Sequence, residues 1–77
     1  MTIKVNGERY STEKETLTQL LEELRIMPER VAIEVNLKVI KRADFSHFSL
    51  HEGDSVEIVY FVGGGNKLRT PRLIFIS

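Results

Sequence analysis

Apolar and polar residues alternate at the start of the chain. This period of two predicts a β-strand, because successive side chains of a strand point to opposite faces. The alternation covers residues 3–5, is interrupted by Asn6-Gly7 and resumes over residues 8–11. Asn-Gly is a strong signal for a two-residue type I′ turn, in which both residues need a positive φ. We therefore expect a β-hairpin over residues 3–11.

A helical spacing of leucines follows the hairpin. Positions i, i+3, i+4 and i+7 of an amphipathic helix with one buried face are filled by Leu17, Leu20, Leu21 and Leu24. Thr16 and Gln19 fit a capping box, in which each side chain bonds to the backbone N–H of the other residue. Pro28 ends the pattern, so we expect a helix over about residues 17–25.

The second half of the chain predicts three more strands. Alternation marks residues 31–35 and, most strongly, residues 56–62, and a short strand around residues 39–40 follows a turn at Asn36-Leu37. Between the last two strands, residues 41–54 predict a short helical turn, a loop and a turn, with two phenylalanines closing one end of the core. One helix laid across one face of a mixed sheet buries such a pattern economically. We predict an α+β fold of the β-grasp (ubiquitin-like) type, with roughly four to five strands and one main helix.

Composition narrows the possible functions. A chain of 77 residues forms one small domain that buries only about 60% of its unfolded surface. It has no cysteine, which excludes disulfides, cysteine-based metal sites, a thiol nucleophile and a side-chain persulfide. The sequence has neither an apolar run long enough to span a membrane nor one of signal-peptide length at its start. We interpret the chain as cytoplasmic, with no membrane partner.

Charge is distributed unevenly although the net charge is zero. Residues 1–65 hold eight basic and eleven acidic residues, a net charge of −3, whereas residues 66–77 hold three basic residues and no acid. An acidic body argues against nucleic-acid binding and suits a basic protein partner.

Three consecutive glycines, Gly63-Gly64-Gly65, directly follow the last predicted strand. A phosphate-binding P-loop would need Gly-Lys-Ser/Thr and a helix, but Asn66-Lys67-Leu68 follows here. A dinucleotide fingerprint would need a third glycine at position 68 and a longer remainder of chain. Two interpretations stay open, a flexible linker and a reactive tail that threads into a partner's active site because it has no Cβ atoms.

The order and spacing of several short motifs over residues 1–65 resemble the ubiquitin-like sulfur carriers of thiamine biosynthesis, the ThiS family. These motifs are Val5-Asn6-Gly7-Glu8, Val35-Asn36, Glu52-Gly53-Asp54 and the strand Val56–Val62 running into the glycines. The resemblance divides the chain into a carrier domain, residues 1–65, and a C-terminal extension, residues 66–77, which we expect to be disordered or removed.

The resemblance implies a carrier and not an enzyme. An adenylating, E1-like enzyme would use ATP and Mg²⁺ to activate the carboxylate of Gly65. Sulfur from a donor such as a cysteine desulfurase would then give a thiocarboxylate, from which a thiazole synthase builds its ring. Gly64 and Gly65 would form the sulfur-carrying terminus and Gly63 a flexible part of the tail. The chain itself would bind no cofactor, metal or nucleic acid.

The extension departs from the family pattern, because an amide at Gly65 cannot be adenylated. We hypothesise that the active form ends at Gly65 after proteolysis. Alternatively, the extension is a gene-prediction or cloning remnant, or the protein has lost the carrier role. Alternative functions are sulfur transfer to molybdopterin or tRNA, and a ubiquitin-like tag or binding module without sulfur transfer. The ending Phe61-Val62-Gly63-Gly64-Gly65 resembles the thiamine carriers more than the molybdopterin carriers.

A partner-docking surface is expected next to the glycines. Glu57, Val59 and Phe61 alternate with the residues that we expect to meet the helix, so they would face outward. Exposed apolar residues close to a reactive tail suit protein docking, and the alternative is that they pack beneath a loop or the tail. We interpret His47 and His51 as solvated surface residues and expect no metal site.

Overall fold

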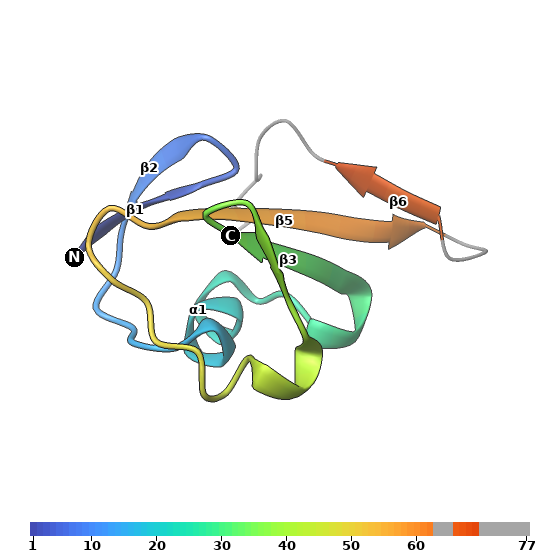
Figure 1. Ribbon diagram of the computed structural model, residues 1–77, viewed down its shortest axis with the longest axis horizontal. Helices are drawn as coiled ribbons and strands as arrows, with labels where there is room; N and C mark the ends of the chain where they lie inside the picture. The colour runs from blue at the N-terminus through green and yellow to red at the C-terminus, as the bar shows by residue number, and fades with distance from the viewer. Residues whose placement is uncertain (63–65, 70–77) are drawn as a thin grey trace.

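The computed structural model describes residues 1–62 and 66–69, in which helix α1 lies across one face of a mixed sheet (Figure 1). The elements are β1 (Thr2–Val5), β2 (Glu8–Ser11), α1 (Leu17–Leu24), β3 (Val31–Val35), β4 (Lys38–Ile40), β5 (Ser55–Val62) and β6 (Asn66–Arg69), with 3₁₀ turns at Pro28–Arg30 and Arg42–Asp44. Within the described residues the strand order is β2-β1-β5-β3-β4, and β6 also pairs with β5. Only the β1–β5 pairing is parallel among these strands.

Two tight turns with positive φ connect the hairpin strands. Asn6 and Gly7 have φ values of 51° and 85°, and Asn36 and Leu37 have values of 52° and 72°. Both turns lie where the sequence predicts them. The strand pairs β1–β2 and β3–β4 are antiparallel on either side of them, with Val5 opposite Glu8 and Val35 opposite Lys38.

The predicted capping box begins helix α1. The Thr16 hydroxyl accepts from the Gln19 backbone N–H at 3.2 Å, and the Gln19 side chain accepts from the Thr16 backbone N–H, also at 3.2 Å. The helix ends at Leu24, because Arg25 takes a left-handed conformation with φ of 62° and its N–H returns to the carbonyl of Glu22. The end is therefore set by the backbone at Arg25 and lies before Pro28.

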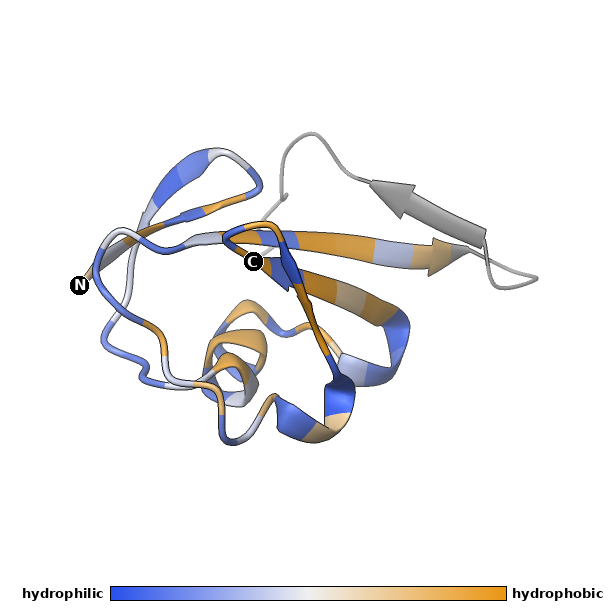
Figure 2. Cartoon of the chain, in the orientation of Figure 1, coloured by the Kyte–Doolittle hydropathy of each residue, from blue (hydrophilic) through white to orange (hydrophobic). Residues whose placement is uncertain are grey.

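The core lies between the helix and one face of the sheet. Figure 2 shows the hydrophobic residues concentrated in β3, β5 and α1. The largest fully buried side chains are Ile3, Val5, Leu17, Leu20, Leu21, Ile33, Val56 and Ile58. Phe45 is buried and Phe48 packs partly against the same cluster, so the predicted role of the phenylalanines is confirmed.

Strand β5 is held on one edge by β3 and on the other first by β1 and then by a side chain. The β1 register with β5 reaches only Val56, which accepts a hydrogen bond from the Asn6 N–H at 2.8 Å. Beyond it, the Asn6 amide oxygen accepts from the Ile58 N–H at 2.7 Å, and the Asn6 amide group donates to the Ile58 carbonyl at 3.2 Å. Asn6 is buried, so its side chain acts as one further residue of β1.

We predict that Asn6→Gly lowers the free energy of unfolding by about 2 kcal/mol, because it leaves the buried N–H and carbonyl of Ile58 without protein partners. Glycine keeps the positive φ, so the change isolates the side chain. Asn36→Gly is the matched control, since Asn36 has the same turn conformation but bonds to Asp54 and Ser55 at an exposed site. Urea denaturation measures both losses. Equal losses in the two variants would contradict the role of Asn6.

Candidate functional site

The end of strand β5 is the part of the described structure closest in sequence to the glycines. The register of β5 with β3 ends at the pair Tyr60–Val31, so Phe61 and Val62 extend past β3. In Figure 1, β5 runs from the end of the molecule that holds the N-terminus towards the opposite end. Gly63, Gly64 and Gly65 lie outside the described residues. The last two residues of β5 therefore project beyond its pairing with β3, directly before the glycines in the sequence.

The three residues of the expected docking surface differ in exposure. Phe61 is 38% exposed and Glu57 is partly exposed, whereas Val59 is buried at 7% exposed. The expectation that Val59 faces solvent is therefore wrong. At this point β5 is flanked on both sides, with Ala32 of β3 and Arg69 of β6 opposite Val59, and a flanked strand exposes less of each side chain than an edge strand does. The docking function itself stays a prediction.

The sheet face that carries Phe61 continues onto neighbouring strands. Glu34 lies opposite Glu57 on one side and opposite Val39 of β4 on the other. Val39 is 68% exposed, although the sequence did not single it out. Val39 and Glu34 belong to different strands, so the alternation of residues within one strand could not predict that they are neighbours. This face combines exposed apolar side chains with two carboxylates on adjacent strands, which suits a protein surface with apolar and basic groups.

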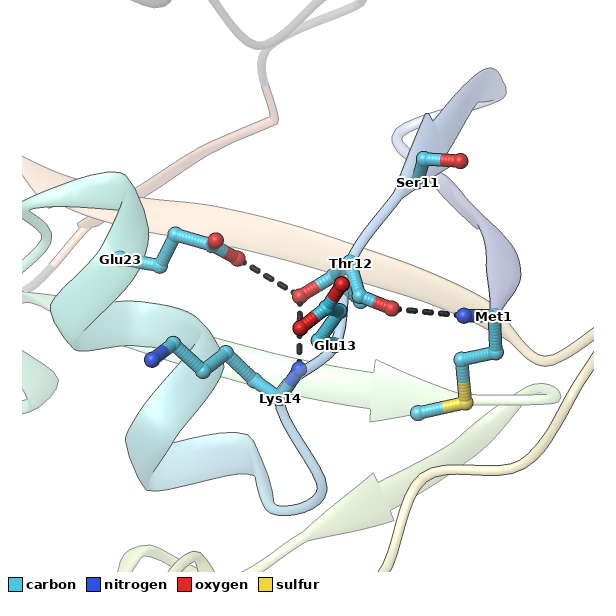
Figure 3. Close-up of a pocket in the computed structure, with 6 residues that line it drawn as sticks. All are labelled: Met1, Ser11, Thr12, Glu13, Lys14 and Glu23. Carbon is cyan, nitrogen blue, oxygen red and sulfur yellow. Dashed lines mark hydrogen bonds between the residues drawn. The ribbon is translucent and has the colours of Figure 1, made fainter.

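A polar pocket of about 420 Å³ lies between the N-terminal residue, the segment that follows β2 and helix α1 (Figure 3). Its lining residues are Met1, Ser11, Thr12, Glu13, Lys14 and Glu23. The Thr12 hydroxyl donates to Glu23 at 2.6 Å and accepts from the Lys14 N–H at 3.0 Å. The Met1 amino group donates to the Thr12 carbonyl at 2.7 Å, and the Thr12 N–H donates to the Met1 carbonyl at 2.9 Å. All polar groups of Thr12 are thus used to tie the chain between β2 and α1 to the rest of the fold.

Tyr10 shares the Glu23 carboxylate with Thr12. Partial burial raises the pKa of the Tyr10 phenol above its ordinary value of 10.0, and the negative charge of Glu23 and a hydrogen bond to it raise the pKa further. These groups link β2 to α1, and stability alone accounts for their bonding.

The two histidines lie on the surface of the domain. His47 and His51 are exposed, as predicted. In the part of the chain that the structure describes, no three His, Cys, Asp or Glu residues lie close enough together to hold a metal ion. The helices formed by residues 1–62 and 66–69 are also too short or too polar to cross a membrane.

Comparison with known proteins gives one consistent family. A model described as the ThiS family matches residues 3–65. The crystal structure of the thiamine biosynthesis protein ThiS from Geobacter metallireducens has a TM-score of 0.74 and 35% identity, covering 84% of this chain and 100% of that chain. This match confirms the predicted β-grasp fold.

Two longer relatives have a different name. Thiazole synthases from Magnetococcus marinus and Paramagnetospirillum magneticum are 42% and 36% identical over 84% and 86% of this chain. The match covers 20% and 21% of those proteins, so the chain spans about a fifth of their length. The uncharacterized protein ycf40 of Porphyra purpurea is 36% identical over 84% of this chain and 93% of that protein.

We predict that Tyr10 adds a pH-dependent contribution to stability. A raised pKa means that the folded state favours the neutral phenol, so the contribution is present below pH 10 and is lost as the pH rises through the folded-state value. Tyr10→Phe should cost about 0.5–1 kcal/mol at pH 8 and less at pH 11, because ionisation of the phenol in the unfolded chain then favours unfolding of the unsubstituted protein alone. Urea denaturation at the two pH values checks this. A cost that grows with pH would contradict it.

Proposed function

Because the chain belongs to the ThiS family, we propose that it carries sulfur for thiamine biosynthesis and is not itself an enzyme. The observation that carries this proposal is the extent of the match. It runs to residue 65, the last of the three glycines that directly follow strand β5. A glycine terminus on a projecting strand suits a carrier whose cargo must enter the active site of another protein.

The proposed chemistry takes place at the carboxylate of Gly65. Hydrolysis of the Gly65–Asn66 peptide bond first releases residues 66–77 and leaves this carboxylate. A carboxylate oxygen then attacks the α-phosphorus of ATP, and pyrophosphate leaves. The outer sulfur of a persulfide on a donor such as a cysteine desulfurase next attacks the carbonyl carbon, and AMP leaves. A second thiol then attacks the donor's sulfur in the resulting acyl disulfide. The thiol and the donor form a disulfide, and a thiocarboxylate remains on the glycine.

Adenylation needs an activating enzyme, because this chain has no nucleotide-binding motif. We propose that an E1-like enzyme supplies ATP and Mg²⁺ and docks on the sheet face that bears Phe61, Val39 and the Glu34–Glu57 pair. The apolar side chains would be buried in the complex, and the carboxylates would attract basic groups of the enzyme.

A thiazole synthase is the proposed sulfur acceptor. The two long relatives named thiazole synthase contain a segment similar to this chain within one polypeptide. Such a covalent connection supports a working association between the two activities. For this chain, a thiazole synthase would receive the sulfur from the thiocarboxylate.

We predict that a protein ending at Gly65 supports ATP–pyrophosphate exchange by the adenylating enzyme of the same organism, whereas the 77-residue chain does not. The reason is that only the shorter protein has a carboxylate at Gly65. A protein ending at Gly64 is the matched control for the length of the tail. Exchange at equal rates with the 77-residue chain would contradict the proposal, as would inactivity of the form ending at Gly65 while it binds the enzyme.

We also predict that Phe61→Asp in the protein ending at Gly65 weakens its binding to the adenylating enzyme by about tenfold or more, since it places a charge in an apolar contact. Leu37→Asp is the matched control. Leu37 is 87% exposed in the β3–β4 turn, at the end of β3 away from the Tyr60–Val31 pair. Titration calorimetry gives the dissociation constants, and circular dichroism checks the fold. Equal effects of the two substitutions would exclude Phe61 from the docking surface.

A further inference from the structure

Three groups cover successive parts of one edge of strand β5. They are the backbone of β1, the side chain of Asn6 and strand β6. Val56 accepts from the Asn6 backbone, and both backbone groups of Ile58 bond to the Asn6 side chain. Successive residues of a strand direct their backbone groups alternately to the two neighbouring strands. The backbone N–H and carbonyl groups of Tyr60 and Val62 therefore point to the same edge as those of Ile58.

Neither β1 nor Asn6 reaches this last part of the edge. The β1 register stops at Val56, and the Asn6 side chain is already used by Ile58. Strand β6 takes the position instead, with Leu68 opposite Tyr60 and Asn66 opposite Val62 (Figure 1). By the same alternation, Tyr60 and Leu68 exchange both backbone hydrogen bonds, and the N–H of Lys67 points away from β5.

We propose that the edge at Tyr60 and Val62 is a docking site for an extended basic segment of a protein partner, and that β6 is its occupant within the same chain. Main-chain pairing accepts any extended segment that runs antiparallel to β5, because it uses only backbone groups. Charge then selects among such segments. The native occupant belongs to a segment, residues 66–77, with a charge of +3, and residues 1–65 carry −3. A basic strand is therefore the chemistry that fits.

The position of β6 gives this edge a built-in competitor. Only three residues connect β5 to β6, so the effective concentration of β6 at the edge is on the order of millimolar or higher. A separate segment of equal intrinsic affinity at micromolar concentration would therefore occupy the edge only rarely while the chain is intact. This step rests on the proposed function, because cleavage after Gly65 would release β6 and free the glycine carboxylate in a single event. A strand edge exposed in this way has unpaired backbone N–H and carbonyl groups, which can pair with a strand of another protein.

The first test uses the 77-residue chain and amide hydrogen exchange. Leu68→Pro removes the N–H that bonds to Tyr60, whereas Lys67→Pro removes an N–H that points away from β5. We expect exchange at Tyr60 and Val62 to become about tenfold faster or more in Leu68→Pro and to change little in Lys67→Pro. The backbone amides of Glu57 and Val59 point towards β3, so their exchange rates serve as internal references. Asn66→Pro is a second variant in case Leu68→Pro disturbs the fold. Equal exchange in both single variants would overturn the assignment of the edge.

The second test adds a synthetic peptide with the sequence of residues 66–77 to the Leu68→Pro chain. We expect it to shift the Tyr60 and Val62 amide resonances and to bind the unmodified chain at least about tenfold more weakly. A peptide with glutamate at positions 67, 69 and 72 is the charge control, and one with proline at position 68 is the backbone control. Equal binding of either control peptide would overturn the proposal. Concentration-dependent dimers of Leu68→Pro would instead assign the edge to a second copy.

These measurements involve neither ATP nor sulfur. If the peptide binds as expected but the protein ending at Gly65 supports no pyrophosphate exchange, the docking edge stands and the carrier function fails. If exchange is active and the peptide does not bind, the carrier function stands and the docking edge fails.

Discussion

The whole sheet depends on satisfying the backbone groups of one central strand. Strand β5 lies between β1 and β3, and its residues Val56 and Ile58 are fully buried on the helix side. An unpaired buried N–H or carbonyl costs about as much as a whole hydrogen bond contributes, so each group on both edges needs a partner. The β1 strand is too short to provide them all. Asn6 extends its reach by one position because a turn residue with positive φ directs its amide back to Ile58.

Local signals in the sequence were sufficient for most of the fold. The Asn6-Gly7 turn, the capping box at Thr16 and the strand alternation depend on residues a few positions apart, and each appears where predicted. The contact from Asn6 to Ile58 spans 52 positions, so no local pattern could reveal it. Burial of Val59 and the pairing of residues 66–69 also depend on neighbours that are set by the tertiary structure. The expectation for the extension did not include a strand at Asn66–Arg69.

For the candidate site, the sequence predicted the chemistry better than it predicted the shape of the docking surface. The absence of cysteine and the run of three glycines already limited where a sulfur atom could be attached. The shape of the docking face depends on which strands are neighbours. Val39 joins it only because β4 pairs with β3 next to Glu34, and Val59 leaves it because β5 is flanked on both sides. Alternation assigns residues to a face, but exposure depends on the next strand.

Two forces hold β6 on the proposed edge, and they respond differently to solution conditions. The attraction between the acidic body and the basic extension weakens as salt is added, because the Debye length is about 10 Å at 0.1 M ionic strength and about 3 Å at 1 M. The ladder between β5 and β6 uses backbone groups in direct contact, which salt screens little. Charge therefore affects which strand associates with the edge, whereas the backbone hydrogen bonds and the three-residue connection determine how long that strand remains bound. A single cut in the connection removes the advantage of the internal strand without changing either force.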